Sequence, residues 1–199
     1  MTTRTFLSLG SNLQPEHNLR LAVAALRERF GEVQLSPVYR TAAFGFEGPD
    51  FLNAIARIDC EIDPFALHRW LHALEETLGR DRRDEYYSNR SLDADIVFFD
   101  DLVLDGPGEM QLPRPELRHA FVLKPMADIA PDFVDPIRET TMADLWAAHP
   151  EHDAPPQVVA LDWDANASTP AASAPDSGQG ADLLNRAAAR VKALLKKHE

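Results

Sequence analysis

Cysteine is almost absent from this chain of 199 residues, which contains Cys60 alone. A single cysteine excludes an intramolecular disulfide, and a reducing compartment suits such a chain. No apolar run approaches the roughly 18 residues that a membrane-spanning helix needs. Lysine and arginine number 20 against 32 acidic residues, and the formal charge of −12 argues against binding of nucleic-acid backbones. We therefore expect a cytoplasmic protein with no nucleic-acid or membrane partner.

Two common nucleotide-binding motifs are also missing. The chain contains neither Gly-x4-Gly-Lys-Ser/Thr nor Gly-x-Gly-x-x-Gly. If this acidic protein handles phosphates, a metal ion or a concentrated basic segment must neutralise their charge locally. His68 and His72 are spaced like zinc ligands on a helix, but Arg69 stands where the glutamate of the zinc-protease motif belongs. We therefore expect no zinc site there.

The hydrophobic patterns predict an α+β fold. We expect strands over residues 5–9, 32–40, 52–62 and 91–99, and helices over residues 15–30, 64–79 and 118–129 with a short one from about 141. The order strand, helix, strand, strand, helix, strand resembles the ferredoxin-like arrangement, in which helices pack on an antiparallel sheet. We expect three layers, α/β/α.

Residues 52–62 alternate between two faces. The apolar face is expected to carry Leu52, Ala54, Ala56, Ile58, Cys60 and Ile62. The other face is expected to carry Asn53, Ile55, Arg57, Asp59 and Glu61. This pattern predicts a half-buried strand with Cys60 in the core rather than at a reactive site.

The composition changes after about residue 154. Residues 165–180 are small and polar with prolines, which is typical of a flexible segment, and residues 181–198 have the pattern of an amphipathic basic helix. We predict a domain over residues 1–155, a flexible linker over 156–180 and an amphipathic helix over 181–199. That helix could pack on the domain, pair with a second copy or stay unattached. We expect a monomer, and this helix is the segment through which copies could associate.

Asp93 and Asp95 are two positions apart on a predicted strand and therefore share a face. The opposite, core-like face is expected to carry Leu92, Ala94, Ile96 and Phe98. Two neighbouring carboxylates repel each other unless a cation lies between them, and Mg²⁺ prefers one or two carboxylates together with substrate phosphates. The alternative is a solvated strand face with two ordinary acids.

Four arginines precede or flank this strand within eleven residues. They are Arg80, Arg82, Arg83 and Arg90. The planar guanidinium group matches pairs of phosphate oxygens. Arginines beside a metal ion recur in the active sites of enzymes that transfer phosphoryl groups. The alternative is a solvated loop in which the arginines pair with neighbouring acids.

Five motifs, in order, resemble the 6-hydroxymethyl-7,8-dihydropterin pyrophosphokinase family. They are Leu9-Gly-Ser-Asn12; Tyr39-Arg-Thr41 with Gly45 and Pro49-Asp-Phe-Leu-Asn-Ala54; Glu75 with Gly79-Arg80-x-Arg82; Arg90-Ser-Leu-Asp-Ala-Asp-Ile96; and Pro113-x-Pro115 with Ala120-Phe-Val-Leu-x-Pro125 and Ile129-Ala-Pro131. The resemblance covers about residues 5–136. Each motif alone is weak, but the ordered set is specific.

The resemblance implies a Mg²⁺-dependent enzyme of folate biosynthesis. It would transfer diphosphate from ATP to the hydroxymethyl group of 6-hydroxymethyl-7,8-dihydropterin and release AMP. Asp93 and Asp95 would hold two Mg²⁺ ions, and Arg80 and Arg90, assisted by Arg82, would neutralise charge on the moving diphosphate. Residues 80–90 would form a mobile lid.

The resemblance also implies two sets of binding residues. The implied pterin-binding set is Thr41, Ala42, Ala43, Phe44, Phe51, Asn53 and Phe121. Asn53 would bind the polar edge of the pterin, and Phe121 would sandwich the ring with Phe51 or Phe44. The implied ATP-binding set is His72, Glu75, Arg80, Arg82, Arg90, Ile96, Arg114 and Arg118.

The chain departs from the usual family pattern at several positions. Asn89 and Arg114 stand where proline and histidine are usual, Ala42-Ala43 replaces Pro-Pro, Ala94 replaces a larger aliphatic residue, and His119 replaces arginine, with Arg118 one place earlier. These departures motivate a second hypothesis, a non-catalytic pterin- or nucleotide-binding relative. A third hypothesis is an interaction protein that acts through its C-terminal helix.

Overall fold

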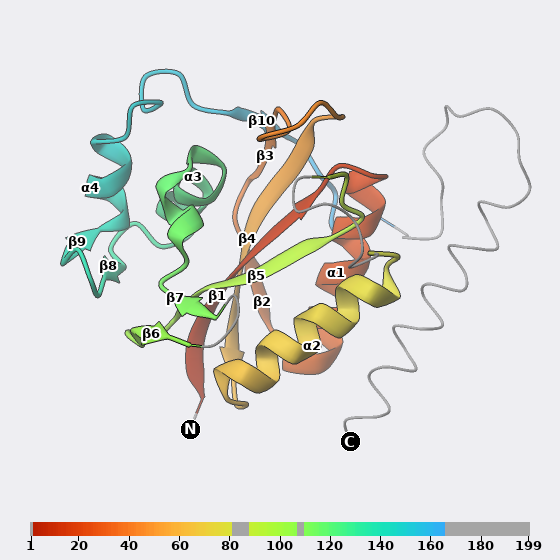
Figure 1. The fold of residues 1–199 in the computed structure, drawn as a ribbon, viewed down its shortest axis with the longest axis horizontal. Coiled ribbons are helices and arrows are strands. Elements are labelled where there is room, and N and C mark those ends of the chain that lie inside the picture. The colour runs from red at the N-terminus through yellow and green to blue at the C-terminus, as the bar shows by residue number, and fades with distance from the viewer. Residues whose placement is uncertain (1, 81–87, 107–109, 166–199) are drawn as a thin grey trace, which may run out of the picture.

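The computed structural model describes residues 2–80, 88–106 and 110–165, and a six-stranded sheet forms their centre (Figure 1). The strands follow the order β10-β3-β4-β1-β5, and β2 also pairs with β4. All of these pairs are antiparallel. The strands are β1 (Thr3–Ser11), β2 (Val33–Leu35), β3 (Val38–Thr41), β4 (Phe51–Cys60), β5 (Asp93–Phe99) and β10 (Gln157–Val159).

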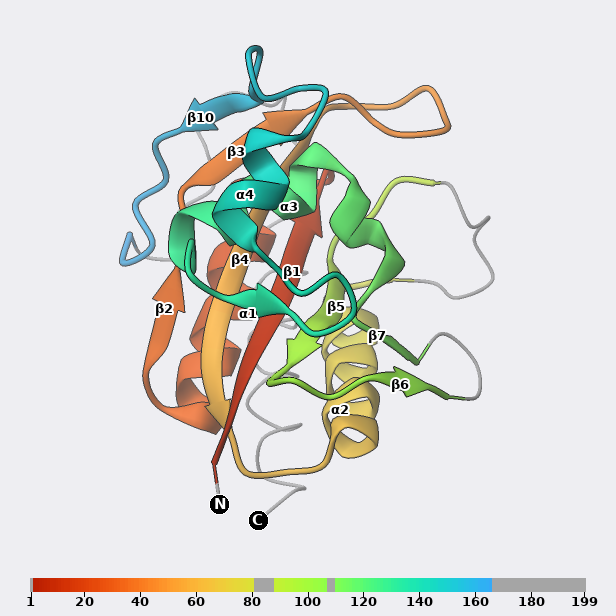
Figure 2. The ribbon, with the colours of Figure 1, turned by 90° about the vertical axis from the view of Figure 1, so that its left-hand side faces the viewer.

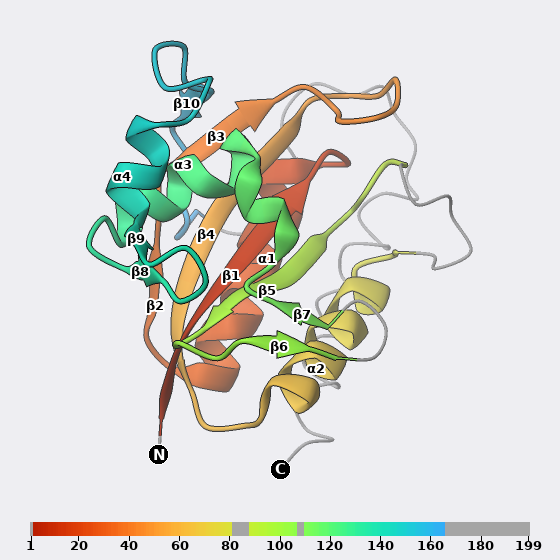
Figure 3. The same ribbon diagram turned by 60° about the vertical axis from the view of Figure 1, so that its left-hand side comes forward.

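Helices cover both faces of this sheet. Helices α1 (Pro15–Phe30) and α2 (Pro64–Thr77) lie on one face. Helix α3 (Ala120–Ile129), preceded by the 3-10 helix η1 (Pro115–Arg118), lies across the other face with α4 (Met142–Ala147) beyond it (Figures 2 and 3). Two short hairpins complete the elements: β6 (Leu104–Asp105) with β7 (Gln111–Leu112), and β8 (Val134–Asp135) with β9 (Thr140–Thr141). The predicted three-layer α+β fold is confirmed, because the order β3-β4-β1-β5 is the ferredoxin-like order.

The two long helices begin and end where local sequence predicts. Pro15 occupies the first turn of α1, and Gly31 ends it with a positive φ of 81°. Asp63 caps α2 by accepting a hydrogen bond from the backbone N–H of Ala66 at 2.9 Å. Leu67, Leu71 and Leu74 recur at helical spacing and are completely buried against the sheet.

Strand β4 differs from the half-buried strand that its alternation predicts. Its predicted apolar face is buried from Leu52 to Cys60, which is 1% exposed, whereas Ile62 lies beyond the end of the strand and is partly buried. The opposite face is also buried at Asn53 and Ile55, because α3 packs over this part of β4. Only toward the end of the strand do Arg57 and Asp59 reach solvent. The alternation could not reveal this second covering layer, which comes from a helix more than sixty residues later.

Strand β5 contains an irregularity that corrects one residue assignment. Phe6 pairs with Phe98, but the next residue of β1, Leu7, pairs with Ile96. Val97 is the extra residue on β5, so the alternation reverses there. Phe98 therefore packs with Phe6 and Phe133 under α3 rather than with Ile96 under α1 and α2.

The segment after residue 156 begins within the folded domain. Gln157–Val159 forms β10 at the edge of the sheet, and Leu161 and Trp163 pack against the core. Arg20 donates to the carbonyl oxygen of Asp162 at 2.7 Å, which ties the segment to α1. The folded part thus extends to at least residue 165, although the linker is predicted from 156. The rest of the predicted linker and the helix over 181–199 lie outside the described residues.

In the part of the chain that the structure describes, no helix has the length and apolar character needed to span a membrane.

Candidate functional site

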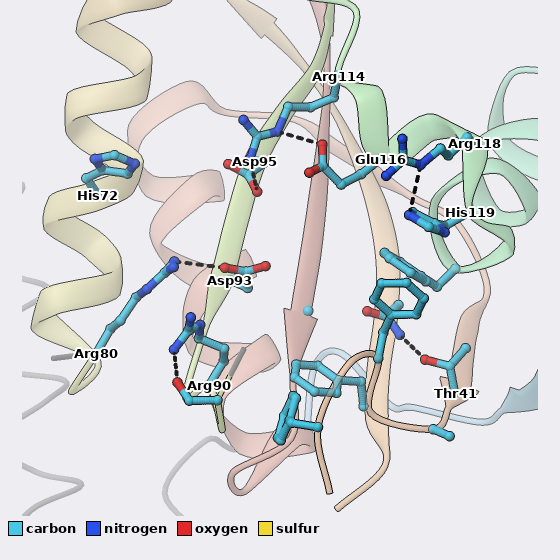
Figure 4. Close-up of a pocket in the computed structure, with 18 residues that line it drawn as sticks. Thr41, His72, Arg80, Arg90, Asp93, Asp95, Arg114, Glu116, Arg118 and His119 are labelled. Carbon is cyan, nitrogen blue, oxygen red and sulfur yellow. Dashed lines mark hydrogen bonds and ion pairs between the residues drawn. The ribbon is translucent and has the colours of Figure 1, made fainter. Parts of the chain in front are cut away.

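A cleft of about 230 Å³ lies over the ends of β4, β1 and β5, between α2 on one side and η1 with α3 on the other (Figure 4). Its residues divide into two groups. The charged half comprises Arg80, Arg90, Asp93, Asp95 and Arg114. The aromatic half comprises Thr41, Phe44, Asn53, His119 and Phe121.

Gly10 joins the two halves. It lies on β1 directly between Asn53 of β4 and Asp93 of β5, its register partners on either side. A Cβ atom at this position would approach Asn53 Oδ1 to 3.0 Å and Asp93 Cβ to 3.9 Å. The missing side chain therefore lets an amide and a carboxylate from different strands border one space.

Arg80 connects the end of α2 with β5. Its Nη1 donates to Asp93 Oδ1 at 2.8 Å and to Glu75 Oε1 at 2.5 Å. The backbone N–H of Arg80 also donates to the carbonyl oxygen of Glu75, which fixes the chain where it leaves α2. These contacts direct the guanidinium group of Arg80 into the cleft beside Asp93.

Glu75 is 1% exposed and does not line the cleft. Besides Arg80, it accepts a hydrogen bond from the backbone N–H of Ala94 at 2.8 Å. Burial raises the pKa of Glu75 to about 8, against the lowering effect of Arg80. Its position makes it a residue that orients Arg80 and β5, whereas the resemblance implies that it borders the nucleotide.

Asp95 has a different arginine partner. Its Oδ2 lies 3.0 Å from Nη2 of Arg114, whose Nε lies 3.3 Å from Glu116 Oε2. Burial, followed by repulsion from Asp93, raises the pKa of Asp95 to about 6, while Arg114 lowers it. Within the described residues, each aspartate of the pair thus contacts its own arginine.

Arg90 is held by the turn that ends β1. Its backbone N–H donates to Asn12 Oδ1 at 2.7 Å, and its guanidinium group donates to Ser88 Oγ. The side-chain N–H of Asn12 also donates to Asn89 Oδ1 at 2.8 Å and to the carbonyl oxygen of Pro49 at 3.2 Å. Asn12 therefore connects three segments, and Asn89, which replaces the usual proline, takes part in that connection.

Asn53 and Thr41 form the polar part of the aromatic half. Asn53 Nδ2 donates to Thr41 Oγ1 at 2.8 Å, and both residues line the cleft. Since the amide N–H₂ of Asn53 faces Thr41, its carbonyl oxygen faces Gly10. This arrangement leaves an acceptor oxygen beside the space between the strands.

Aromatic rings border the rest of this half. The rings of His119 and Phe121 are stacked with centroids 5.1 Å apart and planes at 7°. Phe44 lies on the loop after β3, and 54% of it is exposed. The centroids of the Phe44 and His119 rings are 4.9 Å apart. Phe46 and Phe51 meet edge to face at 6.3 Å nearby. A flat heterocycle would find aromatic surface here.

Most of the predicted site residues meet in this one cleft. The structure places these predicted residues in its lining: Thr41, Ala42, Phe44, Phe51, Asn53, His72, Arg80, Arg90, Asp93, Asp95, Arg114, Arg118 and Phe121. Ala43 does not line it, and Ile96 is buried in the core under α1 and α2 at 3% exposure. A contact between ATP and the side chain of Ile96 therefore has no support. Arg82 and most of the predicted lid lie outside the described residues.

Several residues that line the cleft or position its members are not among the predicted site residues. Gly10, Ser88, Glu116 and His119 line it, and Asn12 holds Arg90. Gly10 and Asn12 belong to a recognised motif, but nothing local indicates which residues they approach. The acid at Glu116, two positions after Arg114, was a signal for an ion pair.

The donor set of the charged half suits Mg²⁺. Asp93 and Asp95 offer oxygen atoms from one face of β5, which are the ligands that Mg²⁺ prefers. Among residues 2–80, 88–106 and 110–165, no group of three His, Cys, Asp or Glu side chains could hold a metal ion by itself. The carboxylates therefore fit an ion whose remaining ligands come from water and a bound phosphate chain.

Known proteins are similar to this chain over the region that builds the cleft. The model of the family described as 7,8-dihydro-6-hydroxymethylpterin-pyrophosphokinase (HPPK) matches residues 6–131. A 2-amino-4-hydroxy-6-hydroxymethyldihydropteridine pyrophosphokinase of Synechocystis sp. is 36% identical over 143 residues, covering 70% of this chain and 72% of the relative. The enzyme of the same name from Pseudomonas aeruginosa is 38% identical over 138 residues, covering 66% and 83%.

Among solved structures, the HPPK-DHPS of Plasmodium falciparum with pteroate matches with a TM-score of 0.61 at 14% identity. The match covers 74% of this chain but 42% of the Plasmodium chain, and at this identity it supports the fold alone. The family match over the region that builds the cleft, together with the two bacterial relatives, shows that the chain belongs to the HPPK family.

Proposed function

We propose that this protein transfers diphosphate from ATP to the hydroxymethyl oxygen of 6-hydroxymethyl-7,8-dihydropterin in folate biosynthesis. The row Asn53, Gly10 and Asp93 is the observation that carries the proposal. It brings an amide suited to the polar edge of a pterin next to a carboxylate suited to a metal–polyphosphate complex. Family membership supports the same reaction.

In this reaction the hydroxymethyl oxygen attacks the β-phosphorus of ATP. A new oxygen–phosphorus bond forms, the bond from the β-phosphorus to the α,β-bridging oxygen breaks, the hydroxyl proton is released and AMP leaves. Such transfers depend mainly on positioning and charge neutralisation. Asp93 and Asp95 would hold two Mg²⁺ ions, which would supply that neutralisation when bound.

The arginines supply the rest of the positive charge. Arg80 is oriented by Glu75, and the guanidinium group of Arg90 donates to Ser88 Oγ, so both guanidinium groups are held before substrates bind. Fixed charges of this kind stabilise a transition state without the cost of reorganisation. Arg82 would assist, as the resemblance implies. Arg114 and Arg118 line the cleft where their guanidinium groups would contact ATP, with His72 across from them.

The aromatic half would hold the pterin. Asn53 Oδ1 would accept a hydrogen bond from the polar edge of the ring, with the amide held by Thr41. Phe121 would stack on one face of the ring, and Phe44 or Phe51 would cover the other. Backbone groups of residues 41–44 would complete the recognition. We propose that the enzyme works as a monomer in the cytoplasm.

The products of the reaction test this proposal. The purified chain, incubated with ATP, Mg²⁺ and the hydroxymethyl dihydropterin, should release AMP and form the pterin diphosphate in equal amounts, as ³¹P NMR would show. The control without pterin should yield neither product. ADP as the nucleotide product would mean single-phosphate transfer and would contradict the proposal. Pterin binding without any AMP would indicate a non-catalytic relative.

A further inference from the structure

Arg114 contacts the same carboxylate group that Asp95 would offer to a metal ion. Its Nη2 lies 3.0 Å from Asp95 Oδ2, and the arginine side chain is 12% exposed (Figure 4). The backbone N–H of Arg114 donates to the carbonyl oxygen of Val97 at 3.1 Å, which holds the start of η1 against β5. The contact with Asp95 is therefore built into the fold and is not a chance encounter of two surface side chains.

The two arginine–aspartate contacts of the charged half differ in kind. Arg80 reaches Asp93 from a position fixed by the buried carboxylate of Glu75. Arg114 contacts Glu116 as well as Asp95, and the ion pair with Glu116 uses a different nitrogen, Nε, at 3.3 Å. Release of Nη2 from Asp95 therefore does not require Arg114 to give up Glu116.

We propose that Arg114 is a displaceable counter-cation that occupies Asp95 in the free protein and passes to the triphosphate when metal and nucleotide arrive together. A metal ion and a guanidinium group on one carboxylate repel each other, so each weakens the binding of the other. Phosphate oxygens satisfy the guanidinium group with the same paired geometry as a carboxylate. The proposal rests on the proposed function, because it takes Asp95 as a metal ligand.

Two consequences follow for the affinity of the protein for a divalent cation. The free protein should bind a divalent cation weakly, because Arg114 competes for Asp95. Once nucleotide is present, the same arginine should strengthen binding, because it gains a phosphate partner. Arg114 thus favours binding of the metal–nucleotide complex over binding of the metal ion alone. It is therefore a specificity-determining residue of this cleft.

Mn²⁺ binding, followed by electron paramagnetic resonance of the unbound ion, tests this without catalysis. In the absence of nucleotide, Arg114→Met should tighten Mn²⁺ binding about fivefold or more, while Arg114→Lys should change it less because the charge is kept. Arg118→Met removes the same charge from the same cleft, but Arg118 contacts His119 rather than a carboxylate. This control should change Mn²⁺ affinity by less than about twofold. If Arg114→Met does not fold, Arg114→Gln serves in its place.

The second measurement uses the non-cleavable analogue α,β-methylene-ATP with Mn²⁺. Here Arg114→Met should weaken analogue binding about tenfold, the opposite sign to its effect on Mn²⁺ alone. Unchanged or weaker Mn²⁺ binding by Arg114→Met without nucleotide would overturn the inference, and AMP formation by the wild type would show that the proposed function stands. Absence of Mn²⁺ binding by every variant, with and without the analogue, would overturn both the inference and the metal role of Asp95.

Discussion

The two halves of the cleft are built by different means. In the charged half, side chains that follow α2, lie on β5 or precede η1 hold one another through ion pairs such as Arg80 with Asp93 and Arg114 with Asp95. In the aromatic half, the rings supply apolar surface for a flat ligand, and the amide of Asn53 is oriented by its hydrogen bond to Thr41. The first half is suited to moving charge, and the second to recognising a neutral ring. Substitutions in the two halves should therefore affect different kinetic quantities.

The largest effect is expected from Asp95→Asn, which removes a charge but keeps the size. Turnover should fall by about three decades or more, because the metal loses a ligand, while pterin affinity should stay within about threefold. AMP formation and pterin fluorescence titration measure the two quantities. Asp59→Asn, an exposed carboxylate on β4, is the control and should leave both unchanged. A rate for Asp95→Asn within tenfold of the wild type would refute the metal role.

Arg80→Ala should lower turnover by about two to three decades, since one lost transition-state contact costs roughly 3–4 kcal/mol. The KM for the pterin should change little, because Arg80 belongs to the charged half. Steady-state kinetics with varied pterin would measure both. Arg57→Ala provides a control on β4, where Arg57 contacts Gln34 and Asp59 away from the cleft. If both variants lose activity equally, the loss comes from the fold and not from the site.

Asn53→Ala should act mainly on pterin binding, in contrast to Arg80→Ala, which should act mainly on turnover. Pterin affinity should fall about tenfold to a hundredfold, in line with roughly 1–3 kcal/mol for a lost hydrogen bond to a buried group. The affinity for ATP, measured by calorimetry with Mg²⁺, should remain that of the wild type. Thr41→Val, which removes only the group that orients the amide of Asn53, should give a smaller loss. An equal loss of ATP affinity in Asn53→Ala would mean that the two halves do not act separately.

The smallest effect is expected where the halves meet. Gly10→Ala places a Cβ atom 3.0 Å from Asn53 Oδ1, so the amide must shift by a few tenths of an ångström. The KM for the pterin should rise about threefold to tenfold, with less change in kcat, because Asp93 Cβ is farther from the added atom. A fall in kcat at unchanged KM would show that Gly10 serves the charged half instead.

Local sequence was sufficient for the long helices but not for every strand, nor for how the elements meet. Pro15, Asp63 and the leucines of α2 determine where helices start and which side is buried, and these features act within a few residues. The reversal at Val97, by contrast, depends on how β5 pairs with β1, which alternation within β5 alone cannot reveal. The strand at Gln157–Val159 pairs with β3 across more than a hundred residues, and its surroundings in sequence resemble a linker.

The same distinction applies to the site. Asp93 and Asp95 were identifiable because two residues on one strand share a face by geometry alone. Their partners were not identifiable, because Arg114 and Asp95 meet only after η1 packs against β5. Likewise, the role of Gly10 depends on two neighbouring strands at once. Motif order located the cleft, whereas the pairing of charges within it required the fold.

The central claim is that the charged half of the cleft transfers the β- and γ-phosphoryl groups of ATP together as diphosphate. Following labelled phosphorus tests this claim most directly. ATP labelled in parallel reactions with ³²P at the β or at the γ position should be incubated with Mg²⁺ and the hydroxymethyl dihydropterin. Both labels should appear in the pterin product in equal yield, and the AMP should carry neither. Label in the pterin product from the γ position alone would contradict the account.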